Sequence, residues 1–467
     1  MSRYLLPLAL TAASASVLPH TPDAGAAVAG VAARAPAQAG MLSFPIVERR
    51  EFKGPATRQR LRRRDDEATL YNATNVAYMI ELGLGTPPQQ VRVQLDTGSN
   101  ELWVDPDCST VTDATSQAFC ESVGTFVPSD SSTLVDTEES TTLAYGRGDA
   151  DIEYVLDTVV VPGSSGNATL KQVQFGVAVA SDDAAVPICG VGFGNNYNLE
   201  YDNIVDQLAL QGVTKSRTLS LALGSATNDD GRDPVGDNIG NGIVIFGGVD
   251  TKKFAGPLYK FTNLPPQSDD PGQPWRYWIQ MDSVGFTAAG KTSSSAYSSS
   301  SMPIVLDSGS SLSYLPQDVM DDLAKSFGVK AQSDGSLIVD CDAGAKGGYV
   351  DFTFDSLVIS VPLSDFIWEA QAGVCAVGAL PSTDTTNLLG DTFLRSAYVL
   401  FDQDHQNIYM AQAANCGSNE QVLSASGNYN LTGECTVQQK SAAAGLVPAS
   451  AMALVALVGV QALMSFL

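Results

Sequence analysis

The chain has 467 residues, of which 44% are hydrophobic and only 16% are charged, and its formal net charge at pH 7 is -25. This length allows one large bilobed unit or two to three domains. The acidic balance argues against nucleic-acid binding, because phosphates would be repelled. The only histidines are His20 and His405, which argues against Ser-His-Asp catalysis, Cys-His catalysis and a His-ligated zinc site. We expect no metal and no cofactor.

The N-terminal region has the pattern of a secretory leader. Arg3 precedes an apolar stretch and small residues end at Ala15, so residues 1–15 are predicted to be a signal peptide. Residues 16–64 are rich in Ala, Pro and Arg and end in a run of arginines. Residues 1–64 hold ten Lys/Arg against three Asp/Glu, whereas residues 65–467 hold 16 and 48. We therefore predict a propeptide over residues 16–64, processed after Arg64, although a solvated basic face is the alternative.

An apolar stretch over residues 78–84 opens the acidic body, and a Gly-Thr-Pro-Pro turn ends it because proline cannot continue a strand there. Val91, Val93 and Leu95 then alternate with polar residues, which is the period of a half-buried strand. The strand stops at the sequence Asp-Thr-Gly-Ser, residues 96–99. Gly98 permits a sharp turn beside the Asp96 side chain.

This motif occurs twice in the chain. Residues 303–306 form a second apolar stretch, followed by Asp-Ser-Gly-Ser at residues 307–310 and further apolar residues. Each Asp turn is followed by a hydrophobic strand that contains glycine, at a spacing of 94 residues (96 to 190) and 83 residues (307 to 390). The repeated order predicts a diverged internal duplication, with two lobes that meet at a cleft.

Further elements are expected between and after the two motifs. Two stretches, residues 142–149 and 152–161, surround a Gly-rich tip and predict a hairpin with Tyr145 near its end. The serine-rich segment 292–301 predicts an exposed loop.

Two Asp-Thr/Ser-Gly turns, each behind an apolar strand, resemble the pepsin family of aspartic endopeptidases. The strands and the glycine-containing segments occur in the same order as in that family. The resemblance implies an all-β, bilobed pepsin-like fold, made of two duplicated β-barrel-like lobes with the active-site cleft between them. The lobes are expected over residues 65–255 and 256–416.

The resemblance also assigns roles to residues. Asp96 and Asp307 would be the catalytic pair that activates water for peptide hydrolysis, with an acid pH optimum. The hairpin would be the flap that closes over a bound peptide. The supporting residues would be the flap residues Tyr145 and Gly146, the turn glycines Gly98 and Gly309, the serines Ser99 and Ser310 that bond the aspartates, the bridging pair Thr97 and Ser308, and Trp103, which would meet Tyr145. Arg147 departs from the small or acidic residue expected beside the flap tyrosine.

Seven cysteines follow residue 64, an odd number, and secretion makes disulfides expected. The sequence does not fix their connectivity. Pairing of neighbours along the chain gives Cys108–Cys120, Cys341–Cys375 and Cys416–Cys435, of which the first two resemble loops of the family. Cys189 is left as a buried free thiol. The candidate glycosylation acceptors are Asn72, Asn167 and Asn430.

The C-terminus has the pattern of a second targeting signal. Residues 417–440 are predicted to be an extension or stalk, and 27 uncharged residues follow Lys440. Small residues and then an apolar tail are typical of a GPI-attachment signal, here residues 441–467. A retained membrane span is the alternative. Together with the basic processing site, this tail resembles the fungal GPI-anchored, yapsin-like branch of the family.

We therefore predict a monomeric aspartic endopeptidase that passes through the secretory pathway to the cell surface, at the plasma membrane or cell wall, in part extracellular. Its partners would be peptide and protein substrates, its own propeptide as an inhibitor, and the membrane through the GPI lipid. The alternatives are a freely secreted digestive aspartic protease, an inactive binding or cell-wall protein of the same fold, and an adhesin or structural wall protein. The cleavage preference does not follow from the sequence.

Overall fold

A computed structural model describes residues 40–48, 70–73, 77–109, 120–145, 148–163, 166–182, 186–224, 243–267, 273–297, 301–371, 373–382, 386–427 and 429–436. The predicted signal peptide, the predicted GPI signal and most of the predicted propeptide lie outside these residues, as do Gly146 and Arg147.

Strands make up most of the described N-terminal half. They are β1 (Leu42–Glu48), β2 (Leu70–Ala73), β3 (Ala77–Leu84), β4 (Gln89–Asp96), β5 (Leu102–Val104), β6 (Val135–Ala144), β7 (Asp149–Val161), β8 (Ala168–Asp182), β9 (Ile188–Gly190), β10 (Thr218–Ala222), β11 (Ile243–Phe246) and β12 (Gly248–Asp250). Short helices of this half include η1 (Pro128–Asp130) and α2 (Ile204–Leu210), and α2 begins with a capping box between Asn203 and Asp206.

The C-terminal half is also mainly strands. They are β13 (Phe254–Thr262), β14 (Trp278–Met281), β15 (Ser283–Thr287), β16 (Ser295–Ala296), β17 (Met302–Leu306), β18 (Ser313–Leu315), β19 (Ile338–Val339), β20 (Tyr349–Phe354), β21 (Leu357–Pro362), β22 (Ile367–Gln371), β23 (Val374–Val377), β24 (Ala379–Pro381), β25 (Leu388–Leu389), β26 (Ala397–Asp402), β27 (Asn407–Ala413), β28 (Glu420–Val422) and β29 (Thr432–Glu434). The helices are α3 (Gln317–Phe327), η2 (Cys341–Lys346), α4 (Leu363–Phe366) and α5 (Asp391–Leu394).

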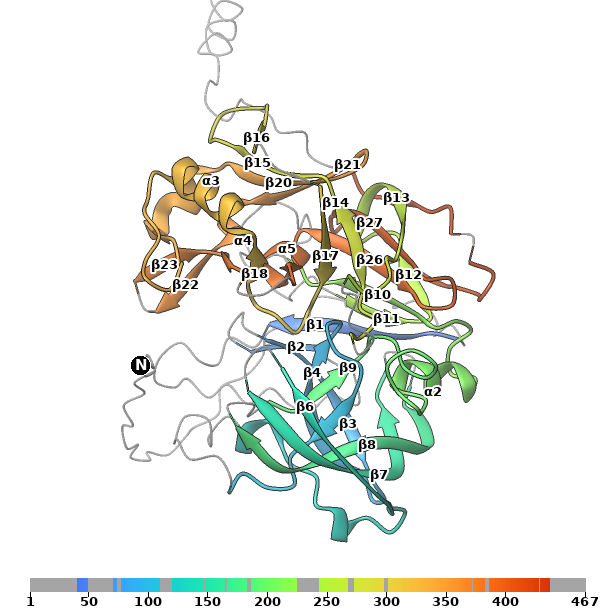
Figure 1. Cartoon of the computed structure of the whole chain (residues 1–467). Helices are drawn as coiled ribbons and strands as arrows, with labels where there is room; N and C mark the ends of the chain where they lie inside the picture. The colour runs from blue at the N-terminus through green and yellow to red at the C-terminus, as the bar shows by residue number, and fades with distance from the viewer. Residues whose placement is uncertain are drawn as a thin grey trace, which may run out of the picture.

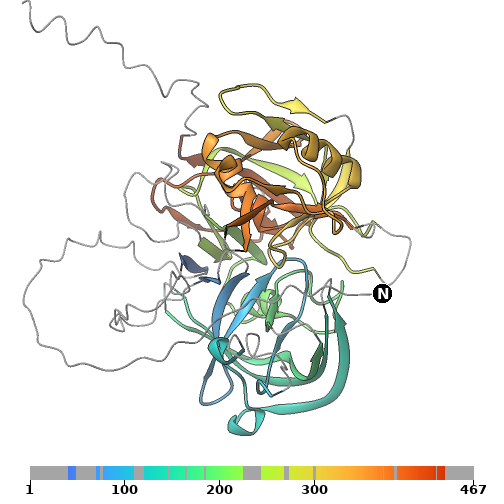
Figure 2. The same cartoon turned by 90° about the vertical axis from the view of Figure 1, so that its left-hand side faces the viewer.

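The two halves form two lobes, with the N-terminal lobe in blue and green below and the C-terminal lobe in yellow and orange above (Figures 1 and 2). A 15-stranded sheet runs in the order β29-β13-β27-β26-β10-β11-β1-β2-β3-β4-β9-β5-β8-β7-β6. Its middle strands β26, β10, β11 and β1 come from both ends of the chain and lie where the lobes meet. This sheet joins the lobes into one body.

Both faces of the middle strands β11 and β26 are covered, and these two strands are almost entirely apolar. Along β11, Val244 and Phe246 belong to the large core cluster, whereas Ile243 and Ile245 belong to a second cluster on the opposite face. The residues of β26 divide between the two clusters in the same alternating way. A period of two residues thus places successive side chains in different cores.

The predicted duplication is visible in the strand pairing. In the N-terminal lobe, β4 pairs in parallel with β9, and β9 pairs antiparallel with β5. In the C-terminal lobe, β17 pairs in parallel with β25, and β25 pairs antiparallel with β18. The first strand of each set leads into an Asp turn. The prediction of an all-β, bilobed fold with duplicated lobes is confirmed.

Strand β1 lies within residues 16–64, the segment predicted to be a propeptide. It pairs antiparallel with β11 and in parallel with β2. Leu42 and Phe44 are buried, and the Phe44 ring meets Phe246 edge-on at 5.7 Å between centroids. In the full chain, part of the predicted propeptide therefore belongs to the sheet that joins the lobes.

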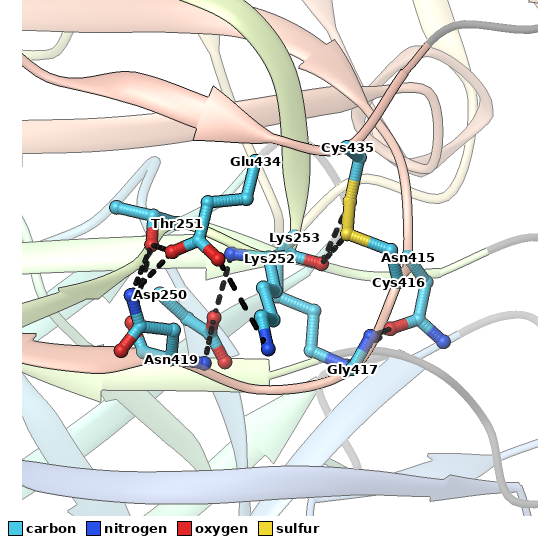
Figure 3. The surroundings of a disulfide bond; sticks show 10 residues. All are labelled: Asp250, Thr251, Lys252, Lys253, Asn415, Cys416, Gly417, Asn419, Glu434 and Cys435. Carbon is cyan, nitrogen blue, oxygen red and sulfur yellow. Dashed lines mark hydrogen bonds and ion pairs between the residues drawn. A yellow bond between two sulfur atoms is a disulfide. The ribbon is translucent and has the colours of Figure 1, made fainter.

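The predicted C-terminal extension is packed against the body over its described part. Strand β28 pairs with β12, and β29 pairs with β13. The disulfide Cys416–Cys435 joins the two ends of this segment beside the Lys252 carbonyl (Figure 3). Glu434 accepts a hydrogen bond of 2.6 Å from Thr251, which fixes the last strand. Residues 417–427 and 429–436 thus pack against β12 and β13.

The structure also contains the disulfides Cys108–Cys120 and Cys341–Cys375. Cys189 is a buried free thiol in β9. His405 lies in the turn between β26 and β27, where its Nδ1 is 3.1 Å from the Asp402 carboxylate. His405 is thus exposed at the surface, with its ring against the Asp402 side chain.

Candidate active site

The two Asp turns bind their own aspartates in the same way. Asp96 ends β4, and its Oδ1 accepts a 2.7 Å hydrogen bond from the Gly98 amide while its Oδ2 accepts one from the Ser99 hydroxyl. Asp307 follows β17, and its carboxylate accepts 2.9 Å bonds from the Gly309 amide and from Ser310 Oγ. Both serines and both turn glycines therefore lie where the sequence places them.

A reciprocal set of bonds locks the turns to each other. The Thr97 amide donates to Ser308 Oγ at 3.2 Å, and the Ser308 amide donates to Thr97 Oγ1 at 2.9 Å. Each hydroxyl donates in turn to a carbonyl of the opposite strand, that of Leu306 for Thr97 and that of Leu95 for Ser308. Thr97 and Ser308 are buried, so these bonds are shielded from water.

The turn glycines allow each aspartate to approach the opposite turn. A Cβ on Gly98 would lie 2.4 Å from Asp307 Oδ1, and a Cβ on Gly309 would lie 2.3 Å from Asp96 Oδ1. Neither space could hold a methyl group. The two carboxyl groups are consequently held face to face across the junction of the lobes.

This arrangement makes the two carboxyl groups one electrostatic unit. Burial raises the pKa of Asp96, and the neighbouring charge of Asp307 raises it further. The hydrogen bonds from Ser99 and Gly98 act in the opposite direction. Because two close carboxylates do not both ionise readily, such a pair retains one proton. The site then contains one protonated carboxyl group, which can act as an acid, beside one carboxylate, which can act as a base.

The predicted hairpin is formed by β6 and β7, with Tyr145 at its tip. The Trp103 Nε1–H donates to Tyr145 Oη at 2.7 Å, and the ring centroids are 6.4 Å apart. The charge of Asp96 contributes to the raised pKa of Tyr145 after burial, which dominates. Tyr145 and Trp103 therefore lie on the Asp96 side of the site. Gly146 lies outside the described residues.

Several contacts at the site were not expected from the sequence. Gln94 Nε2 donates to the Gly309 carbonyl at 2.9 Å and so adds a further link between the lobes. Glu101, between the first Asp turn and β5, accepts hydrogen bonds from Tyr154 and Tyr201. The only sequence signal for Glu101 is its charge between apolar strands, and neither tyrosine belongs to the repeated motif.

The remaining predicted sites are the glycosylation acceptors. Asn167 and Asn430 are exposed, and Asn72 lies in β2. Within the described ranges, no helix is long and apolar enough to cross a membrane. Nor does that part of the chain contain a group of three or more His, Cys, Asp or Glu side chains arranged for a metal ion.

Known proteins share both the sequence and the fold. The family described as "Eukaryotic aspartyl protease" matches residues 77–413. The "Probable aspartic-type endopeptidase opsB" of Aspergillus oryzae is 33% identical over 81% of this chain and 77% of its own length. "Candidapepsin-1" of Candida albicans is 32% identical over 73% of this chain and 82% of its own.

Two further matches extend the comparison. "Aspartic proteinase MKC7" of Saccharomyces cerevisiae is 28% identical over 76% of this chain and 69% of its own. The crystal structure of the aspartic proteinase from Irpex lacteus superposes with a TM-score of 0.54 at 20% identity, covering 73% of this chain and 95% of that one. The match spans both Asp turns and both lobes, and the chain is therefore an aspartic-type endopeptidase of the eukaryotic aspartyl protease family.

Proposed function

We propose that Asp96 and Asp307 are the catalytic pair of this endopeptidase. The observation that carries the proposal is the reciprocal locking of their turns through Thr97 and Ser308, which presents two carboxyl groups at one point. These bonds treat the two turns equivalently, which is expected if both aspartates take part in the reaction and not if only one does. The substrates are peptides, as the family implies, and an extended segment would lie between the lobes beside Tyr145.

The chemistry follows from one shared proton. The ionised carboxylate removes a proton from a water molecule, whose oxygen then forms a bond to the peptide carbonyl carbon. The protonated partner donates its proton to the carbonyl oxygen, which gives a neutral tetrahedral intermediate. Breakdown of this intermediate transfers a proton to the amide nitrogen, breaks the C–N bond and restores the shared proton. Ser99 and Ser310 would orient the two carboxyl groups throughout.

An acid pH optimum is part of the proposal. The pair must hold one proton, and burial together with Asp307 makes Asp96 retain its proton to higher pH than a free aspartate. Residues 65–467 also hold 48 Asp/Glu against 16 Lys/Arg. Many of those charges are neutralised in acid, which lowers the self-repulsion of the body.

The basic N-terminal segment is proposed to be an inhibitory propeptide. Its charge is opposite to that of the body, so protonation of the body's carboxylates would weaken the attraction. Strand β1 gives this segment a fixed place, between β11 and β2, beside the junction of the lobes. Cleavage after Arg64 would then break the covalent link between β1 and the rest of the protein. Release that responds to neither acid nor salt would contradict the electrostatic part of this proposal.

A cell-surface location is proposed from the C-terminal signal. The body ends in a packed segment closed by Cys416–Cys435, so an anchor added beyond residue 440 would leave the fold intact. The relatives include one printed as "Secreted aspartic protease 1" of Candida albicans, so free secretion is the second candidate. Release of the protein from intact cells by a phosphatidylinositol-specific phospholipase would favour the anchor. Recovery of all activity in the medium would favour secretion.

The catalytic proposal is tested with the processed protein and a mixed peptide library, from about pH 3 to about pH 7. An Asp307→Asn variant is purified in the same way, and a statine-type inhibitor is added in a parallel reaction. Cleavage in acid that is lost in both controls would establish the pair, and the cut sites would reveal the preference. A folded, propeptide-free protein that cleaves nothing would instead be an inactive member of the family.

A further inference from the structure

Glu101 is a charged residue in the N-terminal lobe that the reaction scheme does not use. It lies five positions after Asp96, between the catalytic turn and β5. Its carbonyl accepts a 2.9 Å bond from the Gly190 amide, which fixes its backbone against β9. The side chain therefore starts from a backbone position that is tied rigidly to the catalytic turn.

The carboxylate of Glu101 is held by two tyrosine hydroxyl groups. Tyr154 Oη donates to Glu101 Oε2 at 2.5 Å, and Tyr201 Oη donates to the same oxygen at 3.2 Å. The two rings are in edge contact, with centroids 5.6 Å apart and planes at 67°. The two donors come from different parts of the lobe, because Tyr154 belongs to β7 and Tyr201 precedes α2.

Tyr154 connects this cluster to the hairpin. Along β7, Ala150, Ile152 and Tyr154 alternate toward the same side, where they pack with Trp103. Trp103 in turn donates to Tyr145 at the hairpin tip. The segment from Asp96 to Trp103 thus contacts the hairpin twice, through Trp103 at the tip and through Glu101 farther along the returning strand.

Within the part of the chain that the structure describes, no positive charge accounts for the partial burial of Glu101. Among the described residues, none of the ion pairs includes this carboxylate. Burial raises the pKa of Glu101, and the hydrogen bonds from both tyrosines oppose the shift. Glu101 is partly buried, and the two tyrosine hydroxyl groups offset the cost of removing its carboxyl group from water. A protonated carboxyl group still offers its carbonyl oxygen to the tyrosine hydroxyl groups, so the link also holds in acid.

We propose that Glu101 is a positioning residue that ties the returning strand of the hairpin to the catalytic turn through Tyr154. The tie sets the resting height of the hairpin over Asp96 and limits how far it opens. This inference rests on the proposed role of the hairpin as the flap over a bound peptide. Tyr201 donates to the same oxygen, and its contact with the hairpin is made by its ring, which packs edge-on against Tyr154 and is retained when only the hydroxyl is removed.

The difference between the two tyrosines supplies a matched control. The test compares Glu101→Leu, Glu101→Gln, Tyr154→Phe and Tyr201→Phe in the processed protein, with a peptide substrate long enough to contact the hairpin. Glu101→Leu and Tyr154→Phe each remove the tie and are expected to raise KM by up to about tenfold while kcat changes less than about twofold, since the net loss of one buried hydrogen bond corresponds to at most about one order of magnitude. Glu101→Gln keeps a neutral acceptor and should recover part of the loss.

Tyr201→Phe removes a bond to the same oxygen but leaves the hairpin tied, so its KM should stay within about twofold of the parent. The double variant Glu101→Leu/Tyr154→Phe should be no worse than either single variant, because both remove the same interaction. Equal effects of Tyr154→Phe and Tyr201→Phe would overturn the proposal. A fall in kcat at unchanged KM would overturn it as well.

Hydrogen exchange separates this inference from the catalytic proposal. In the absence of substrate, amides of residues 141–152 should exchange faster in Glu101→Leu and Tyr154→Phe than in the parent, and at the parent rate in Tyr201→Phe. This readout does not depend on activity. If the parent protein cleaves no peptide yet shows this exchange pattern, the proposed catalytic pair fails and the tie stands. If cleavage is normal and the exchange is unchanged, the tie alone fails.

Discussion

At the scale of single residues, the site depends on side chains that serve the opposite lobe. Thr97 accepts from the Ser308 amide and donates to the Leu306 carbonyl, at 2.9 Å in both cases. A buried group that loses its hydrogen-bond partner costs about 1–3 kcal/mol. Thr97 thus stabilises the fold and aligns the catalytic pair at the same time.

We predict that Thr97→Val lowers the free energy of unfolding by about 2–4 kcal/mol, because it keeps the shape and leaves two buried backbone groups unpaired. The kcat value should also fall, since the two turns are no longer locked in register. Thr97→Ser retains the hydroxyl and serves as the matched control. Urea unfolding and peptide kinetics measure both effects. A Val variant as stable and active as the Ser variant would show that the lock is dispensable.

The second residue-scale prediction concerns Asp96 and pH. Burial and the charge of Asp307 raise its pKa from 3.8 to about 7. A carboxyl group with a raised folded-state pKa resists ionisation, so it costs no stability below pH 3.8 and an increasing amount as the pH rises toward 7. Asp96→Asn removes the ionisation. Its stability relative to the parent should therefore improve by about 1–3 kcal/mol between acid and neutral pH.

This comparison is made by urea unfolding of both proteins at pH 4 and pH 7, with Glu121→Gln as an exposed control. Asn also lacks one of the hydrogen-bond acceptors of Asp. This changes the free energy of unfolding by the same amount at both pH values and therefore cancels in the difference. A stability difference that is the same at the two pH values would mean that Asp96 is not protonated preferentially in the folded protein.

At the scale of elements, the strand that joins the lobes from the predicted propeptide is the main surprise. Phe44 of β1 is fully buried and meets the edge of Phe246. We predict that Phe44→Ala lowers the free energy of unfolding of the unprocessed chain by about 3–5 kcal/mol. Leu210→Ala, at a side chain that is 67% exposed, should change it by less than about 0.5 kcal/mol. Equal effects in thermal unfolding would show that β1 is not docked in solution.

The elements also show what the sequence could and could not predict. The Asp turns, the hairpin and the duplicated strand order follow from local periodicity and repetition, and all of them are present. Strand β1 was not predicted, because the Ala- and Pro-rich composition around it indicates a dispensable leader. The tie between Glu101 and its tyrosines was also missed, since the partners lie 53 and 100 residues away and belong to no repeat. Such contacts depend on packing, which periodicity does not encode.

At the scale of the whole molecule, charge is the most distinctive property. The formal net charge is -25, and residues 65–467 alone hold 48 Asp/Glu against 16 Lys/Arg. A body with this excess repels itself at neutral pH, and salt screens that repulsion over a distance that falls from about 30 Å at 0.01 M to about 3 Å at 1 M. In acid, protonation of the carboxylates removes much of this repulsion, so little of it is left for salt to screen.

We therefore predict that raising NaCl from about 0.01 M to about 1 M increases the Tm of the processed protein at pH 7 by several degrees and at pH 4 by much less. The pH 4 series is the control for salt effects on hydrophobic burial, which are present at both pH values. Calorimetry with the Asp307→Asn variant avoids self-digestion. An equal rise at both pH values would assign the effect to burial rather than to charge, and the acidic surface would then have to be explained by solubility alone instead of by a preference for acid conditions.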